Sequence, residues 1–269
     1  PRSAVNNESS ALKILSEQPW LHEFSIQEPK AIPGVWGRRG SFALLGTLFN
    51  FVLKPSVSLA SELEVQRRKI GLDRVNPDDM ISMHIRHGDA CNTTHTHHLK
   101  YRKCLPLSAY MVHAEKIRRN EGKRGNYLST DSRTIIEDTK RFPSWSFVFQ
   151  QRPRRADNDS IYWDDALAEG KLDAYNEAKW AIFDWHFLSS GTAFIGAFSS
   201  SFSRVAYAMM VAKHGTKGCW PSFVSVDKSK AMQCMDWGVN EPCFAGDDAS
   251  VLQSSFQLLS DEEDAGATA

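Results

Sequence analysis

The chain has 269 residues, 42% of them hydrophobic and 24% charged, which is typical of a globular protein with one large or two modest domains. Lys+Arg and Asp+Glu are equal at 32 each, so no overall charge favours nucleic acid or an anionic membrane surface. We therefore expect no nucleic-acid partner, and any phosphate binding must depend on a few placed residues.

The sequence shows no recognisable signal or membrane anchor. It opens at Pro1 without a methionine. We therefore expect that any upstream signal, anchor or domain is not included in this sequence. A connection to a membrane is expected only through such an upstream segment.

Five cysteines are too few for a disulfide scaffold, and their spacings match no zinc-ligand pattern. Cys91 and Cys104 could pair in an oxidising compartment, and buried or free thiols fit the sequence equally well. Glycosylation sequons at Asn7, Asn92 and Asn158 permit a secretory setting. These features favour a lumenal location without deciding it.

Residues 1–75 are expected to form a lead-in and linking helices. The first 35 residues are polar and punctuated by prolines. Apolar faces then predict a helix over 36–52 and a second over 58–72, which Ser58 would cap.

From Asp78 onward the pattern alternates between strand and helix. The predicted strands are 80–85, 126–130, 146–149 and 193–198, and the predicted helices are 106–119, 133–142, 172–188 and 202–214. This alternation predicts an α/β fold over 76–245, a doubly wound parallel sheet covered by helices on both faces. Residues 246–269 are acidic, rich in small residues and expected to form a tail.

Ligand-binding residues in such a fold gather where strands end and helices begin. Arg86 follows the first predicted strand, and its planar guanidinium matches phosphate oxygens bidentately. A structural ion pair with a neighbouring carboxylate fits the same position equally well.

Ser199, Ser200 and Ser201 lie between an apolar strand and a helix, so hydroxyls and free amides meet at a helix N-terminus. This is an anion site, although the serines could equally serve as helix caps. Arg204, one turn further on, could add a second cation or lie on a solvated face.

Two carboxylates are candidates for a ribose or a base edge. Asp131 closes the second strand, where it could also cap a helix, and Asp184 lies inside an apolar helix, where it could pair with a core cation.

Three histidines, His95, His97 and His98, lie beside basic residues. No carboxylate or thiol completes a metal site with them, so a solvated basic loop, suited to covering a phosphorylated ligand, is the favoured interpretation.

Five strings in order resemble one family, the α-1,6-fucosyltransferases, which includes the enzymes that fucosylate the core of N-glycans and a related rhizobial enzyme acting on chitin oligosaccharides. The strings are residues 84–89, 110–113, 127–131, 184–189 and 198–207, and the resemblance runs from about Gly34 to Asn240.

The resemblance implies the Rossmann-like, C-terminal donor-binding half of a GT-B-type enzyme. Such an enzyme transfers L-fucose from GDP-β-L-fucose to a glycan containing GlcNAc, with inversion and without a metal or other cofactor. Arg86 would grip the β-phosphate and Asp184 the guanine. The other implied donor-binding residues are His84, His87, Tyr110, Asp131, Ser199, Ser200, Ser201 and Arg204. The implied location is the Golgi lumen in a eukaryote and the cytoplasm otherwise.

The chain departs from the family pattern at the general base. Mammalian-type members carry a glutamate shortly after the arginine motif, whereas residues 90–104 contain no Asp or Glu. Either Asp89 or one of His95, His97 and His98 is the candidate base here, since imidazole has a pKa near the operating pH. An inactive sugar-nucleotide binder and a fragment that needs an N-terminal half remain alternatives.

Overall fold

The computed structural model describes residues 40–91, 104–154, 163–197, 200–214 and 221–226. Nearly all of them fall in one compact unit, Phe42–Ser229. The predicted lead-in and the predicted acidic tail lie outside the described residues.

Five strands form one sheet in the order β3-β2-β1-β4-β5, and every pair of neighbours is parallel. The strands are β1 (Met80–Ile85), β2 (Gly125–Thr130), β3 (Ser146–Val148), β4 (Ala193–Gly196) and β5 (Ser222–Ser225). The predicted parallel α/β sheet is therefore confirmed. The chain builds outward from β1 to β3 and then returns to add β4 on the other side of β1, so a switch point lies between β1 and β4.

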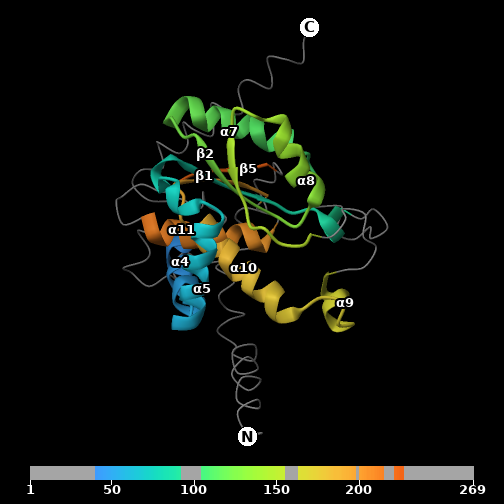
Figure 1. Cartoon of the computed structure of the whole chain (residues 1–269). Coiled ribbons are helices and arrows are strands. Elements are labelled where there is room, and N and C mark those ends of the chain that lie inside the picture. The colour runs from blue at the N-terminus through green and yellow to red at the C-terminus, as the bar shows by residue number, and fades with distance from the viewer. Residues whose placement is uncertain (1–39, 92–103, 155–162, 198–199, 215–220, 227–269) are drawn as a thin grey trace, which may run out of the picture. The chain divides into compact units, whose positions relative to one another are not determined.

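Helices cover both faces of the sheet (Figure 1). On one face lie α7 (Leu107–Glu121) and α8 (Arg133–Asp138), and on the other lie α10 (Ala174–Leu188) and α11 (Ser201–His214). Two further helices, α4 (Gly40–Val52) and α5 (Val57–Lys69), accompany α10 and α11.

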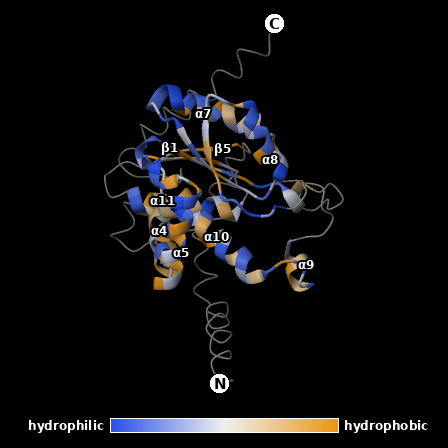
Figure 2. Cartoon of the chain, viewed as in Figure 1, coloured by the Kyte–Doolittle hydropathy of each residue, from blue (hydrophilic) through white to orange (hydrophobic). Residues whose placement is uncertain are grey.

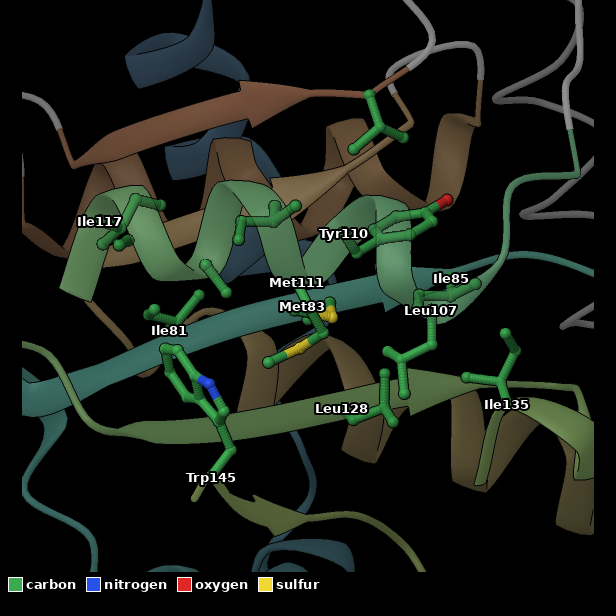
Figure 3. Close-up of a cluster of buried hydrophobic side chains, with 14 residues drawn as sticks. Ile81, Met83, Ile85, Leu107, Tyr110, Met111, Ile117, Leu128, Ile135 and Trp145 are labelled. Carbon is green, nitrogen blue, oxygen red and sulfur yellow. The ribbon is translucent and has the colours of Figure 1, made fainter. Parts of the chain in front are cut away.

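The alternation of β1 assigns its side chains to these two faces. Ile81, Met83 and Ile85 join the apolar cluster under α7, which Figure 3 shows. Ser82 and His84 point to the opposite face, where the Ser82 hydroxyl donates to the Leu188 carbonyl of α10 at 2.6 Å. All six residues of β1 are buried, as expected for the central strand of a parallel sheet.

The predicted helices and strands exist, with shifted ends. The predicted Ser58 cap is wrong, because α5 begins at Val57 and the hydroxyl of Ser56 accepts from the Leu59 amide at 3.3 Å. The predicted helix 133–142 divides into α8 and a short 3-10 turn, Thr139–Arg141. The chain also contains α9 (Trp163–Ala168) and β5, which no pattern in the sequence had indicated.

Hydropathy follows these layers, with apolar residues concentrated in the strands and on one side of several helices (Figure 2). No single described helix has the length and apolar character of a membrane span, although the bent pair formed by 43–52 and 57–69 meets both criteria jointly.

Candidate functional site

A cavity of about 330 Å³ opens over the carboxyl ends of β1, β2 and β3 and beside the start of α11. Its walls carry three arginines, Arg86, Arg152 and Arg154, and three carboxylates, Asp131, Glu177 and Asp184. The edge of the sheet where ligands were expected therefore holds a cavity lined by charged and apolar side chains, next to the switch point between β1 and β4.

Arg86 forms an ion pair with Asp131 across the ends of β1 and β2. The second carboxylate oxygen of Asp131 accepts a hydrogen bond from the backbone amide of His87 at 2.8 Å. Both predicted residues therefore lie together on the cavity wall, and the ion pair that competed with phosphate binding is present. Asp131 is not a helix cap, because the hydroxyl of Ser132 caps α8 instead.

Gly88 lets the chain turn beside this pair. Its φ is +55°, in the left-handed region that L side chains rarely adopt. A Cβ at this position would lie 2.8 Å from Oδ2 of Asp131. The motif therefore requires glycine here for both backbone conformation and space.

His84 points from β1 into the cavity and is held on two sides. Its Nδ1 lies 2.7 Å from the hydroxyl of Ser203, and its ring stacks on Phe202 with 4.7 Å between centroids. Burial, with further contributions from the charges of Arg86 and Arg152, lowers the pKa of His84 to about 3. The imidazole is therefore neutral at physiological pH and acts here as a polar, uncharged wall.

Phe202 lies between His84 and Trp185 in a stacked column. The ring of Trp185 lies 4.8 Å from that of Phe202, and its indole nitrogen donates to the Phe202 carbonyl at 3.3 Å. This column connects β1, the first turn of α11 and α10, so it fixes the N-terminus of α11 at the cavity.

Asp184 is the most buried carboxylate of the cavity, with 3% of the residue exposed. One of its oxygens accepts a hydrogen bond from the hydroxyl of Tyr127 on β2, and the other lies 3.7 Å from Nη2 of Arg152. Burial, together with the adjacent Asp184 carboxylate, raises the pKa of Tyr127 well above its ordinary value. The tyrosine therefore remains a hydrogen-bond donor.

The two arginines Arg152 and Arg154, which follow β3, were missed in the sequence analysis. The signal that could have found them is the rule that located Arg86: they are cations within a few residues of the carboxyl end of a strand of a parallel sheet. Glu177 and Trp163 were also missed, and they reach the cavity from α10 and α9.

The structure places the remaining predicted residues at different distances from the cavity. Ser200 lines the cavity, whereas Ser201 accepts from the buried Arg204 at 3.1 Å and neither residue is on the cavity wall. The structure does not bring Tyr110 to the cavity, because it faces the apolar cluster on the α7 side of the sheet (Figure 3).

His87 does not line the cavity, and its Nε2 lies 2.9 Å from the Leu105 carbonyl. Ser199 and the histidines His95, His97 and His98 lie outside the described residues. The backbone of Asp89 is in the short 3-10 helix Gly88–Cys91, but its side chain is not among those described.

Cys91 and Cys104 form a disulfide, with their Cα atoms 5.6 Å apart. The disulfide links the two ends of the segment that carries the three histidines. Its first cysteine, Cys91, is two residues after Asp89. Within the described part of the chain, no three His, Cys, Asp or Glu side chains are grouped so that they could hold a metal ion.

The fold and the cavity together define a parallel α/β protein with a cavity lined by charged and aromatic side chains next to the switch point of its sheet. A family model described as "Alpha-(1,6)-fucosyltransferase N- and catalytic domains" matches residues 38–228, and the chain belongs to this family. It is 23% identical over 173 residues to an alpha-(1,6)-fucosyltransferase of Drosophila melanogaster, a match that covers 62% of this chain. The matched region is 25% of that relative's length, so the chain corresponds to about a quarter of it.

Proposed function

We propose that this chain is the Rossmann-like, donor-binding half of a GT-B-type fucosyltransferase that uses GDP-β-L-fucose. The reaction would transfer L-fucose with inversion to a glycan containing GlcNAc, forming an α-1,6 linkage without a metal. The observation that carries the proposal is the meeting of Arg86, Ser200 and Asp184 on one cavity at the switch point of the sheet.

The diphosphate would lie between Arg86 and the N-terminus of α11, where Ser200 supplies a hydroxyl. Departure of a nucleoside diphosphate from the sugar builds negative charge on the β-phosphate. A fixed guanidinium and helix-end amides stabilise that charge more in the transition state than in the ground state. In the absence of ligand, Asp131 keeps Arg86 on the cavity wall, and a phosphate would compete for the same guanidinium.

The guanine base of the nucleotide would lie towards Asp184. The Asp184 carboxylate would accept hydrogen bonds from the donor groups of guanine. Tyr127 supports this assignment, because its hydroxyl orients one carboxylate oxygen and leaves the remaining acceptor positions for a ligand.

The acceptor hydroxyl needs a general base close to the anomeric carbon. Asp89 or a histidine among His95, His97 and His98 is proposed for this role, because all four follow Arg86 within twelve residues of the sequence. Replacing the three histidines by alanine should remove the acidic limb near neutral pH from the pH profile of turnover, because a general base must be deprotonated to act. An unchanged profile would leave Asp89 as the candidate.

The Cys91–Cys104 disulfide supports an oxidising compartment, and the Golgi lumen is proposed as the location in a eukaryote. The absence of Asp and Glu from residues 90–104 favours one alternative, an inactive sugar-nucleotide binder. The two functions differ in an observable way, since the binder takes up GDP without transfer or donor hydrolysis.

Calorimetric titration with GDP and GDP-fucose, followed by transfer assays on chitin oligosaccharides and N-glycans, tests the proposal. Binding of GDP-fucose with transfer to either acceptor is the expected result. Binding without transfer would establish the inactive alternative, and binding of neither nucleotide would overturn the proposal.

A further inference from the structure

Arg152 and Arg154 flank Pro153 at the end of β3 and both line the cavity, but their guanidinium groups are used differently. Arg154 donates through Nε to the Thr130 carbonyl at 3.1 Å, through Nη1 to the Arg152 carbonyl at 3.2 Å and through Nη2 to the Gln150 carbonyl at 2.8 Å. All three of its nitrogens thus bind backbone, and Arg154 connects the segment after β3 to the end of β2.

Arg152 makes no comparable set of bonds. Its Nη1 lies 3.6 Å from the Glu177 carboxylate and its Nη2 lies 3.7 Å from that of Asp184, while its only hydrogen bond to a described residue spans 3.5 Å to the Thr130 carbonyl. At these distances the two carboxylates orient the guanidinium by charge, and they do not occupy its N–H donors in short hydrogen bonds. The side chain is 13% exposed, so its donors face the cavity from a nearly dry wall.

The cavity therefore places a bidentate donor beside a bidentate acceptor, Arg152 beside Asp184. Guanine has the matching edges: N1–H and the 2-amino group are adjacent donors, and O6 and N7 are adjacent acceptors. Arginine is the side chain that most often binds O6 and N7 of guanine bidentately. Adenine presents an amino donor where guanine has O6, so it would oppose donor to donor at Arg152.

We infer that Arg152 is a specificity-determining residue, which reads O6 and N7 of a guanine base whose N1–H and 2-amino group are bound by Asp184. This inference rests on the proposed function, since it concerns the base of the same nucleotide. Glu177, with a carboxylate oxygen 3.6 Å from Nη1, and the ring of Trp180, 5.7 Å from the guanidinium carbon, orient the guanidinium of Arg152.

Three diphosphates separate the two contacts in a calorimetric titration of the full chain. GDP offers both edges, IDP lacks the 2-amino group that Asp184 would bind, and 7-deaza-GDP lacks the N7 acceptor that Arg152 would bind. The wild-type chain is expected to bind GDP about tenfold more tightly than either analogue, which is the usual effect of one charge-assisted hydrogen bond.

The variant Arg152→Met is expected to lose the preference for GDP over 7-deaza-GDP and to keep the preference over IDP. Asp184→Asn should show the reverse pattern. Arg152→Lys, which keeps the charge between the two carboxylates, covers the case in which the methionine variant does not fold, and it should reduce the 7-deaza preference to about threefold. Arg154→Lys is the matched control, with both preferences unchanged and a lower melting temperature.

If Arg152→Met or Arg152→Lys lowered both preferences together, Arg152 would act only by supporting Asp184 and the inference would be overturned. Equal binding of GDP and 7-deaza-GDP by the wild-type chain would also overturn it while leaving the proposed function intact. Failure of the wild-type chain to bind GDP and GDP-fucose would instead remove the proposed function.

Discussion

Arg86 and Asp131 form an ion pair that joins the carboxyl ends of the neighbouring strands β1 and β2. The same carboxylate accepts the backbone amide of His87, so Asp131 fixes both the side chain and the main chain of the motif. The cation proposed to receive the leaving diphosphate is thus oriented before the ligand arrives, which is the physical basis of electrostatic preorganisation.

Arg86→Ala should lower kcat for fucosyl transfer about 100-fold to 1000-fold, because a fixed donor to the developing phosphate charge is lost. Steady-state kinetics with GDP-fucose measure this effect. Asp131→Asn keeps an acceptor for the His87 amide and should cost much less. Near-normal turnover by the alanine variant would show that Arg86 has no role in transfer.

Gly88→Ala should destabilise the fold by about 1–3 kcal/mol, because it combines a left-handed backbone with a contact on Asp131. The matched control is Gly122→Ala after α7, where φ is also positive, at +73°, but nothing lies within 4 Å of the new Cβ. Denaturant unfolding of both variants measures the difference. Equal losses in the two variants would mean that the contact with Asp131 contributes nothing.

His84 should make the fold sensitive to acid. Its pKa of about 3 in the folded chain lies below the unfolded value near 6.5, so the unfolded state binds the extra proton first. Stability is therefore fully present above about pH 6.5 and is lost as the pH falls towards 3. Arg86 and Arg152 face the ring and oppose its protonation.

The variant His84→Gln keeps a polar neighbour for Ser203 and removes this titration. Between pH 7.5 and pH 5 the wild-type chain should lose about 2 kcal/mol more unfolding free energy than the variant. Urea unfolding at the two pH values provides the comparison. Parallel losses in both proteins would contradict the assignment of the proton uptake to His84.

Tyr127→Phe should reduce stability by about 1–3 kcal/mol, because the buried Asp184 carboxylate loses its donor. GDP binding should weaken as well, since Asp184 is then less well oriented. Tyr207→Phe is a suitable control, as that buried hydroxyl donates to the Pro221 carbonyl at 2.9 Å and Tyr207 does not line the cavity. A loss of GDP affinity in the control as large as that in Tyr127→Phe would indicate a general effect of destabilisation.

Much of the fold was predictable because its strands and helices have local signals. The residues of β1 form a buried apolar run that ends at a charged motif, and the predicted bounds of that strand agree with the structure. The short elements α9 and β5 were not predictable, since six and four residues carry too little periodicity to distinguish them from loops.

The site was predictable only where a residue follows a strand of clear pattern. Arg86 and Asp131 follow β1 and β2 and were identified on that basis. Arg152 follows β3, a three-residue strand whose signal is weak, and Glu177 approaches the cavity from the first turn of α10. Tyr110 was selected because it lies in a string that resembles the family, residues 110–113. Such a resemblance does not determine which face of the sheet the side chain occupies.

By itself the sequence determined the alternation of strands and helices, the parallel sheet and the family to which the chain belongs, because these depend on residues close together along the chain. Only the tertiary structure decided which charges meet. Arg86 with Asp131, Tyr127 with Asp184 and Arg152 between two carboxylates are contacts between residues 25 to 57 positions apart. Such pairs depend on strand order and register, which place distant strand ends side by side and which no local pattern specifies.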